Sequence, residues 1–235
     1  MSLKRSHRPE YRVQLPVTNK RLNYSSFTMR TERTLMLATM GGDADEITNA
    51  AINCINDHIG SSTVKAEDLP QVEAELLLLL MRAKSVGETI DVNVTDPLDE
   101  TANYPVKIDL TDITVDVDPE FKSTIQLKSG EIIEFRLPGL RRLEGLNPDL
   151  NEFDQSVEII GRCINTIAIE EEVYAKSDLQ MSELKDFILD LDPGDFKVIA
   201  DSFLSRMPKL SHTVNVERED GSSFEAEITG LASFL

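Results

Sequence analysis

The sequence predicts an α+β fold in which helices pack on an antiparallel β-sheet, followed by a smaller helical part closed by a C-terminal β-hairpin. Three observations favour this class. After a short strand pair near the start, apolar residues recur at helical spacing up to about residue 86, alternate with polar residues in the middle of the chain, and return to helical spacing from about residue 148. We expect an N-terminal α+β domain over residues 1–146, which begins with a basic arm, and a helical part with the terminal hairpin over 147–235. That boundary is nominal if the terminal hairpin pairs back with the first sheet.

Composition describes an ordinary globular protein. The 235 residues are 40% hydrophobic and 28% charged, which is enough for one large core or two small ones. The longest apolar run, Leu76–Met81, is far shorter than the roughly 20 residues of a membrane span. The first residues are basic and polar, so we expect no secretory signal and synthesis in the cytoplasm. We expect Cys54 and Cys163 to be small buried hydrophobes without a disulfide.

Charge is unevenly distributed along the chain. The net charge of the chain is −18. Residues 1–33 carry a charge of +6, so the remaining residues carry −24. The basic residues of this arm are Lys4, Arg5, Arg8, Arg12, Lys20, Arg21, Arg30 and Arg33. An acidic body argues against general nucleic-acid binding, which relies on clustered Lys and Arg. The arm itself suggests docking onto charged partners, although a solvated N-terminus without a specific role also accounts for it.

The first elements are a strand pair and two helices. "YRVQLP" and "RLNYSSF" alternate around a Thr-Asn-Lys turn, which predicts two short antiparallel strands. "TERTLMLATMGG" predicts a helix that Gly41 and Gly42 terminate. In "DEITNAAINCINDHIG", apolar residues form one helical stripe and Gly60 is the expected C-terminal cap.

The third helix begins near Asp68, has Pro70 in its first turn and carries five consecutive leucines, "LLLLL". Five residues exceed one turn of about 3.6 residues, so the leucines cannot all face one neighbour. The helix is therefore either a central core helix or one that uses a side for a partner. Gly87 follows at the position where an αL residue ends a helix, and we interpret it as the structural joint to the next strand.

The segment "RAKSVGE", Arg82 to Glu88, raises the question of a phosphate loop. Its lysine precedes its single glycine, so successive backbone amides cannot form an anion cradle. Arg82 and Lys84 instead place positive charge at the negative end of the helix dipole, where it is stabilising.

The middle and last segments predict hairpins and further helices. "TIDVNVT", "VKIDLTDITVDV" and "TIQLKSGEIIEF" alternate as half-buried strands, the last with a turn at Ser129-Gly130. We expect one helix to keep Phe153, Val157, Ile160, Ile164 and Ile167 in register, followed by helices in "MSELKDFILDL" and "PGDFKVIADSFLSRMP". "HTVNVEREDGSSFEAEIT" predicts the terminal hairpin, and the apolar end Phe234-Leu235 either tucks into the core or inserts into a partner.

The chain shows no catalytic motif. No nucleophile elbow is present, and the three histidines are scattered, so we expect no enzyme activity, no cofactor and no metal. Two acidic clusters could bind a hard cation, although strand ends and helix N-caps also explain them. Their members are Asp116, Asp118 and Glu120, and Asp190, Asp192 and Asp195.

Several segments together resemble a known family. They are "LPVTNKRLNYSSFTMRTERTLMLA", "LLLLLMRAKSVGETIDVNV", "VKIDLTDITVDVDP" and the ending "EITGLASFL". The order and content of these segments resemble the baseplate hub proteins of T-even-type contractile-tailed bacteriophages, a family that includes a hub subunit and a hub-assembly factor. Some members carry Cys pairs that suit a zinc knuckle, but this chain has no Cys in the corresponding hairpins.

The resemblance implies a non-enzymatic structural protein or assembly chaperone that binds other phage baseplate hub proteins during tail assembly, without nucleic acid or a membrane span. It implies a location in the host cytoplasm during assembly, and in the virion tail baseplate if the protein is retained. Homo-oligomerisation stays open. The candidate partner-interface residues are Arg82, Lys84, Ser85, Glu88, Arg5, Arg8, Arg12, Leu231, Phe234 and Leu235. Two alternatives remain: an acidic regulatory protein that mimics nucleic acid, and an Mg²⁺-dependent enzyme that uses the acidic clusters.

Overall fold

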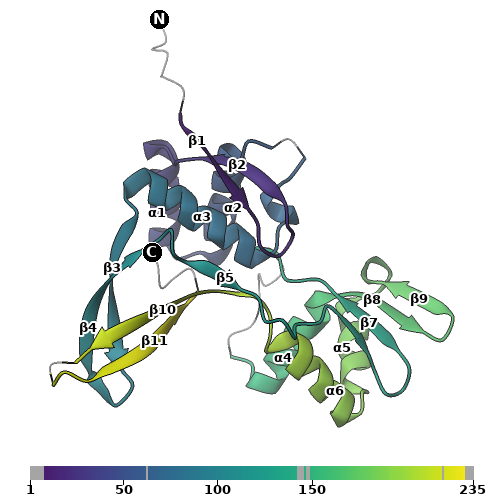
Figure 1. Ribbon diagram of the computed structural model, residues 1–235. Coiled ribbons are helices and arrows are strands. Elements are labelled where there is room, and N and C mark those ends of the chain that lie inside the picture. Colours follow the sequence, from purple (N-terminus) through teal and green to yellow (C-terminus); the bar gives the residue numbers. More distant parts are fainter. Residues whose placement is uncertain (1–7, 62, 142–145, 147–148, 219, 231–235) are drawn as a thin grey trace, which may run out of the picture. The chain divides into compact units, whose positions relative to one another are not determined.

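The computed structural model describes residues 8–61, 63–141, 146, 149–218 and 220–230 (Figure 1). The chain forms two compact units, one of Met1–Asp116 with Lys209–Leu235 and one of Val117–Pro208. Both units combine helices with small antiparallel sheets, which confirms the predicted α+β class.

The first unit begins with the expected strand pair. Strands β1 (Glu10–Gln14) and β2 (Arg21–Ser25) are antiparallel, and Val13 lies opposite Leu22. The buried carboxylate of Glu73 accepts hydrogen bonds of 2.8 Å from the two amides of Val17 and Thr18 and from the Thr18 hydroxyl. A side chain of the third helix therefore holds the region between the two strands.

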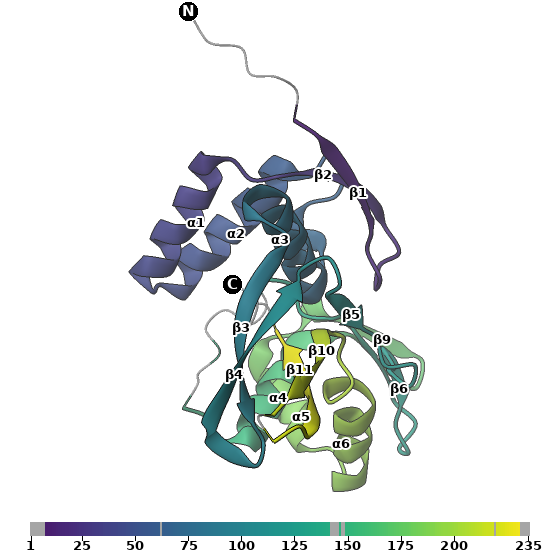
Figure 2. The same cartoon turned by 60° about the vertical axis from the view of Figure 1, so that its left-hand side comes forward.

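Three helices follow, with α2 (Ala44–His58) between α1 (Met29–Gly41) and α3 (Gln71–Val86) (Figure 2). Thr28 caps the start of α1, and Gly42 ends it with a φ of 73°, as the Gly-Gly pair predicts. Because α2 separates α1 from α3, α1 lies at the periphery of this unit.

The expected cap at Gly60 is wrong. Helix α2 ends at His58, its C-cap residue Ile59 has extended backbone, and Gly60 donates its amide to the carbonyl of Asn23 at 2.8 Å. A Cβ at Gly60 would lie 3.3 Å from the Cβ of Asn23. The glycine therefore permits a close approach of the chain to β2 instead of ending the helix.

The leucine helix is a central core helix, which confirms one of the two interpretations. A 3₁₀ turn, η1 (Ala66–Asp68), precedes α3, and Pro70 is its N-cap residue. Four of the five leucines are buried, and α3 contacts β2 and α2 as well as strands of the next sheets. Leucines on several sides are needed because this helix has neighbours on several sides.

Five strands complete the first unit and form two antiparallel sheets, β3-β4 and β11-β10-β5. The strands are β3 (Thr89–Asp96), β4 (Asp99–Asp109), β5 (Thr114–Asp116), β10 (Lys209–Glu217) and β11 (Ser223–Thr229). Their inner faces share a core with α3 that includes Leu79, Ile108 and Leu210. Alternation along these strands therefore reflects one buried face, as predicted.

The terminal hairpin pairs with the first part of the chain. Strand β10 pairs with β5, and Leu210 lies opposite Val115. The compact units consequently differ from the predicted domains 1–146 and 147–235, since the hairpin belongs to the first unit. Alternation within a strand predicts that it has partners but does not say which strand it pairs with.

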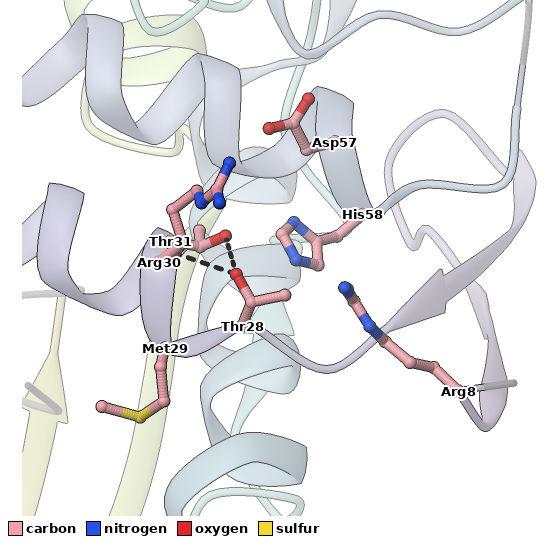
Figure 3. Close-up of a pocket in the computed structure, with 7 residues that line it drawn as sticks. All are labelled: Arg8, Thr28, Met29, Arg30, Thr31, Asp57 and His58. Atoms are coloured by element: carbon pink, nitrogen blue, oxygen red, sulfur yellow. Dashed lines mark hydrogen bonds between the residues drawn. The ribbon is translucent and has the colours of Figure 1, made fainter. Parts of the chain in front are cut away.

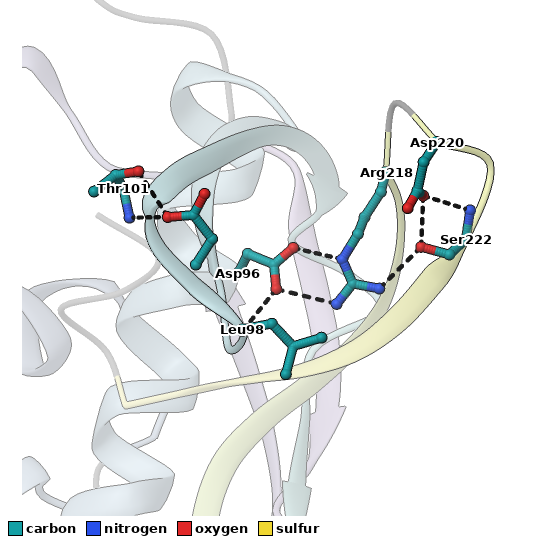
Figure 4. A network of polar contacts seen from close by, with 7 residues as sticks. Asp96, Leu98, Thr101, Arg218, Asp220 and Ser222 are labelled. Atoms are coloured by element: carbon teal, nitrogen blue, oxygen red, sulfur yellow. Dashed lines mark hydrogen bonds and ion pairs between the residues drawn. The ribbon is translucent and has the colours of Figure 1, made fainter.

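An ion pair joins the β3-β4 hairpin to the β10-β11 hairpin (Figure 4). Arg218 donates from Nε to Asp96 Oδ2 at 2.5 Å and from Nη2 to Oδ1 at 3.0 Å. The side chains are only 16% and 4% exposed, and the guanidinium also lies over the ring of Phe224. The hydrogen bond from Arg218 is the main reason that the pKa of Asp96 is lowered.

The second unit has one four-stranded antiparallel sheet in the order β6-β7-β8-β9. Its strands are β6 (Thr124–Gln126), β7 (Ile132–Phe135), β8 (Ile164–Ile169) and β9 (Glu172–Ala175). Its helices are α4 (Glu152–Cys163), α5 (Met181–Leu189) and α6 (Pro193–Ile199), with a 3₁₀ turn η2 (Lys176–Asp178) and a π-helical turn η3 (Ala200–Leu204). Phe203 stacks on Phe135 in the core of this unit, with ring centroids 4.4 Å apart.

The predicted helix through Ile164 and Ile167 is wrong. Helix α4 ends at Cys163, and the next residues form β8 between β7 and β9. Both isoleucines are buried, so the apolar positions were identified correctly but assigned to the wrong element. Isoleucine at such positions suits a paired strand as well as a helix face. Cys54 and Cys163 are buried, as expected.

Candidate protein-binding surface

The predicted interface residues at the end of α3 are mostly engaged within the fold. Lys84 forms an ion pair with Glu88, and its ammonium lies 5.3 Å from the ring centre of Tyr11. The hydrogen bond to Glu88 is the main cause of the raised pKa of Lys84. These contacts hold the end of α3 against β1.

Ser85 is part of the same junction. Its hydroxyl accepts a hydrogen bond from the Phe27 amide and donates one to the Met81 carbonyl, both at 2.6 Å. Arg82 is half-buried. Each of these residues thus lies at the joint between α3 and the first strands, where an interface role stays a prediction.

Gly87 is a structural joint of an unusual kind. Its φ and ψ are 150° and 152°, a combination that is essentially restricted to glycine. The predicted αL cap is therefore wrong, although the requirement for glycine holds. With this extended backbone at positive φ, Gly87 links the end of α3 to the start of β3.

The remaining predicted residues lie at the two ends of the chain. Arg8 and Arg12 are exposed, Arg8 just before β1 and Arg12 within it. The other four lie outside the described residues. They are Arg5, Leu231, Phe234 and Leu235.

An apolar face on α1 was missed by the sequence analysis. No residue of α1 is buried, and four large apolar side chains on it are more than half exposed. They are Met29 (77%), Met36 (55%), Leu37 (52%) and Met40 (76%). Spacings of seven and four residues put the three methionines on one side of the helix, with Arg33 between them. Exposed apolar faces of this kind mark protein-binding sites, and methionine adapts to irregular partners.

A pocket opens at the first turn of α1 (Figure 3). It encloses about 530 Å³ and is lined by Arg8, Thr28, Met29, Arg30, Thr31, Asp57 and His58. His58 is 4% exposed, and its Nδ1 lies 2.8 Å from the Cys54 carbonyl oxygen. Its Nε2 is buried and has no hydrogen-bond partner among the described residues. The sequence offered only a lone histidine here, because the lining comes from three separate segments.

The acidic clusters serve structural roles where their contacts are seen. Asp118 accepts a hydrogen bond from Arg206 at 2.6 Å, and Asp192 caps α6 through the Gly194 amide at 2.8 Å. Buried Asp195 accepts from the Lys128 amide at 3.1 Å. Within the described part of the chain, no group of three or more His, Cys, Asp or Glu residues is placed to hold a metal ion. No described helix is long and apolar enough to cross a membrane.

Comparison with known proteins assigns the family. Residues 8–235 match the model of the family described as T4 bacteriophage base plate protein. The chain belongs to this base plate family. It is also 28% identical over 230 residues to the baseplate hub assembly protein gp26 of Enterobacteria phage T4, covering 96% of this chain and 98% of the relative. No solved structure matches the chain.

Membership of the base plate family confirms the resemblance inferred from the sequence. The match extends through both compact units and includes the terminal hairpin. The family therefore describes nearly the whole chain, and it favours a role in building a phage tail structure over a role in catalysis.

Proposed function

We propose that this base plate protein is a non-enzymatic component or assembly factor of the baseplate hub of a contractile-tailed phage and acts by binding other hub proteins. The relative from phage T4 is named as a hub assembly protein and aligns along nearly its whole length. The observation that carries the proposal is α1, a helix of 13 residues without a single buried residue and with an exposed row of methionines.

The occupant of the α1 face is a segment of another hub protein that combines apolar and acidic residues. The methionine row supplies the apolar contact, and Arg33 lies within the row. Arg30 and Arg8 add positive charge at the start of the same helix. Complementary negative charge on the partner would orient the encounter and exclude other partners.

The interface residues predicted from the sequence differ in how far they are available to a partner. Arg82 is half-buried and Arg12 is exposed, so both are open to a second contact with a partner. Lys84 and Ser85 act first within the fold, through Tyr11, Glu88 and Phe27. Replacing Lys84 or Ser85 would therefore disturb the joint as well as any interface.

Co-expression with each hub protein of the same phage tests the proposal. Size-exclusion chromatography and native mass spectrometry should show a defined complex with at least one of them. The double substitution Met36→Ser and Met40→Ser should abolish the complex while far-ultraviolet circular dichroism stays unchanged. Leu98→Ser is the matched control, since Leu98 is 86% exposed on the β3-β4 hairpin. Failure to form any complex, or equal loss with the control, would reject the proposal.

Retention in the particle is a separate question. A structural subunit and a transient assembly factor predict different compositions of the finished virion. Quantitative mass spectrometry of purified virions separates them: a stoichiometric amount shows a subunit, and absence shows an assembly factor.

A further inference from the structure

The pocket at the start of α1 has an unusual polar group at its wall. A carbonyl oxygen only accepts hydrogen bonds, so His58 Nδ1 must donate to Cys54. The other ring nitrogen, Nε2, is therefore the atom left for a ligand. Figure 3 shows the imidazole directed toward the space between Thr28 and Arg8. Buried polar atoms nearly always have a partner, so this exception requires an explanation.

The surroundings of Nε2 favour a negative ligand. The first amides of a helix have no partner within the helix, and they carry the positive end of its dipole. In α1 the Thr28 hydroxyl accepts a hydrogen bond from the Thr31 amide. The amides of Met29 and Arg30 come before Thr31 in the first turn, so this cap does not use them. Arg8 and Arg30 add two guanidinium groups. Helix N-termini with such neighbours bind oxyanions.

The charged side chains that line the pocket would be balanced by a ligand with a single negative charge. Arg8 and Arg30 contribute two positive charges and Asp57 one negative charge. Figure 3 shows the Asp57 carboxylate directed away from His58, so it borders the pocket without filling it. Phe27 packs against the imidazole, with ring centroids 5.8 Å apart in an edge arrangement. A monoanionic carboxylate matches this balance better than a dianionic phosphate.

Met29 connects the pocket to the apolar row of α1. It lines the pocket and is also the first methionine of the row. A ligand in the pocket is therefore next to the surface that we assign to a hub partner. A free small molecule would use the pocket alone, whereas a peptide could use both.

We infer that this pocket binds a carboxylate side chain on an acidic segment of the partner that covers α1. The inference rests on the proposed function for the identity of the partner. The carboxylate would accept hydrogen bonds from the first amides of α1 and from Arg30. It would also meet His58 Nε2, which donates when the ring carries a proton on both nitrogens.

Nuclear magnetic resonance titration of the full chain tests the inference with two probes, a hexaglutamate peptide and inorganic phosphate. Hexaglutamate should shift the His58 Nε2 resonance and the amides of Met29 and Arg30 in a saturable way. Arg30→Gln should weaken its binding by at least about tenfold, the loss expected for a charged hydrogen bond. Arg30 is exposed, so this change should leave the fold intact. Arg21→Gln, an exposed arginine of β2 outside the lining, is the control and should change binding little.

Each other result contradicts the inference. Saturation by phosphate without saturation by hexaglutamate would reject the carboxylate assignment. Equal weakening by Arg21→Gln and Arg30→Gln would show general charge attraction without use of the pocket. Absence of any shift at His58 would reject the site. The titration uses no hub protein, so its failure would leave the complex-formation test of the proposed function unaffected, and the reverse also holds.

Discussion

The hydroxyl of Ser85 lies 2.6 Å from the amide nitrogen of Phe27, 58 residues earlier in the chain. Together with its bond to the Met81 carbonyl, this contact joins the end of the leucine helix to the segment that leads into α1. The "RAKSVGE" segment is therefore a structural junction, and α1 depends on it for its position.

Ser85→Ala should lower the free energy of unfolding by about 0.5–1.5 kcal/mol, because one long-range and one local hydrogen bond are lost. Urea denaturation followed by circular dichroism measures this change. Ser223→Ala, at an exposed position at the start of β11, is the matched control. Equal effects of the two substitutions would mean that the Phe27 contact contributes nothing.

Gly87→Val should destabilise the first unit by about 1–3 kcal/mol, because a β-branched residue is strained at a φ of 150°. A thermal unfolding curve of each variant gives the comparison. Gly41→Ala, at the last residue of α1, should be neutral or slightly stabilising, because alanine favours helix over glycine. Tolerance of valine at Gly87 without loss of stability would contradict the assigned backbone conformation.

Leu79→Ala should lower the free energy of unfolding by about 2–5 kcal/mol, the range for a leucine removed from a packed core. Leu79 is fully buried in the core that α3 shares with the strands. Leu98→Ala should change stability by less than about 0.5 kcal/mol, since its side chain is 86% exposed. Chemical denaturation of both variants tests whether α3 is the central helix.

The Arg218–Asp96 pair predicts a specific dependence on pH. Arg218 holds the pKa of Asp96 below its ordinary value. The stabilisation is therefore fully present above that ordinary value, about 3.9, and is lost as the pH falls through the lower pKa of the folded state. Asp96→Asn should consequently be less stable than the parent chain at pH 7, and the gap should narrow towards pH 3.

Denaturation at pH 7, 5 and 3 measures that gap. Asp91→Asn, an exposed position on β3, should show no comparable gap. A difference between Asp96→Asn and the parent chain that stays constant across the three pH values would show that the ion pair does not contribute through its charge.

Local patterns predicted much of the fold. Alternation identified the β1–β2 pair and the β6–β7 and β10–β11 hairpins, and helical spacing identified α1, α2 and α3. The two-glycine stop after α1 and the need for glycine at Gly87 were also readable, because each depends on backbone conformation at one position. Long-range pairing was harder to predict. Only the structure shows that β10 pairs with β5 and that Ile164 lies in a strand.

The candidate surface could be predicted less well than the fold. A helix pattern tells which residues share a face, but the exposure of that face depends on what else the chain places over it. The spacing of Met29, Met36 and Met40 was the available signal, but the sequence analysis assigned no face to this helix. The pocket gave no signal, since Arg8, Thr28 and His58 meet only after β1, α1 and α2 have packed.

Hydrogen–deuterium exchange on the purified complex tests most directly whether a hub protein binds through α1. If the hub protein covers α1, amides of Met29–Gly41 exchange more slowly in the complex than in the free chain. The exposed β3-β4 turn around Leu98 should exchange at the same rate in both. Protection elsewhere in the chain with α1 unchanged would show that the hub protein binds another surface.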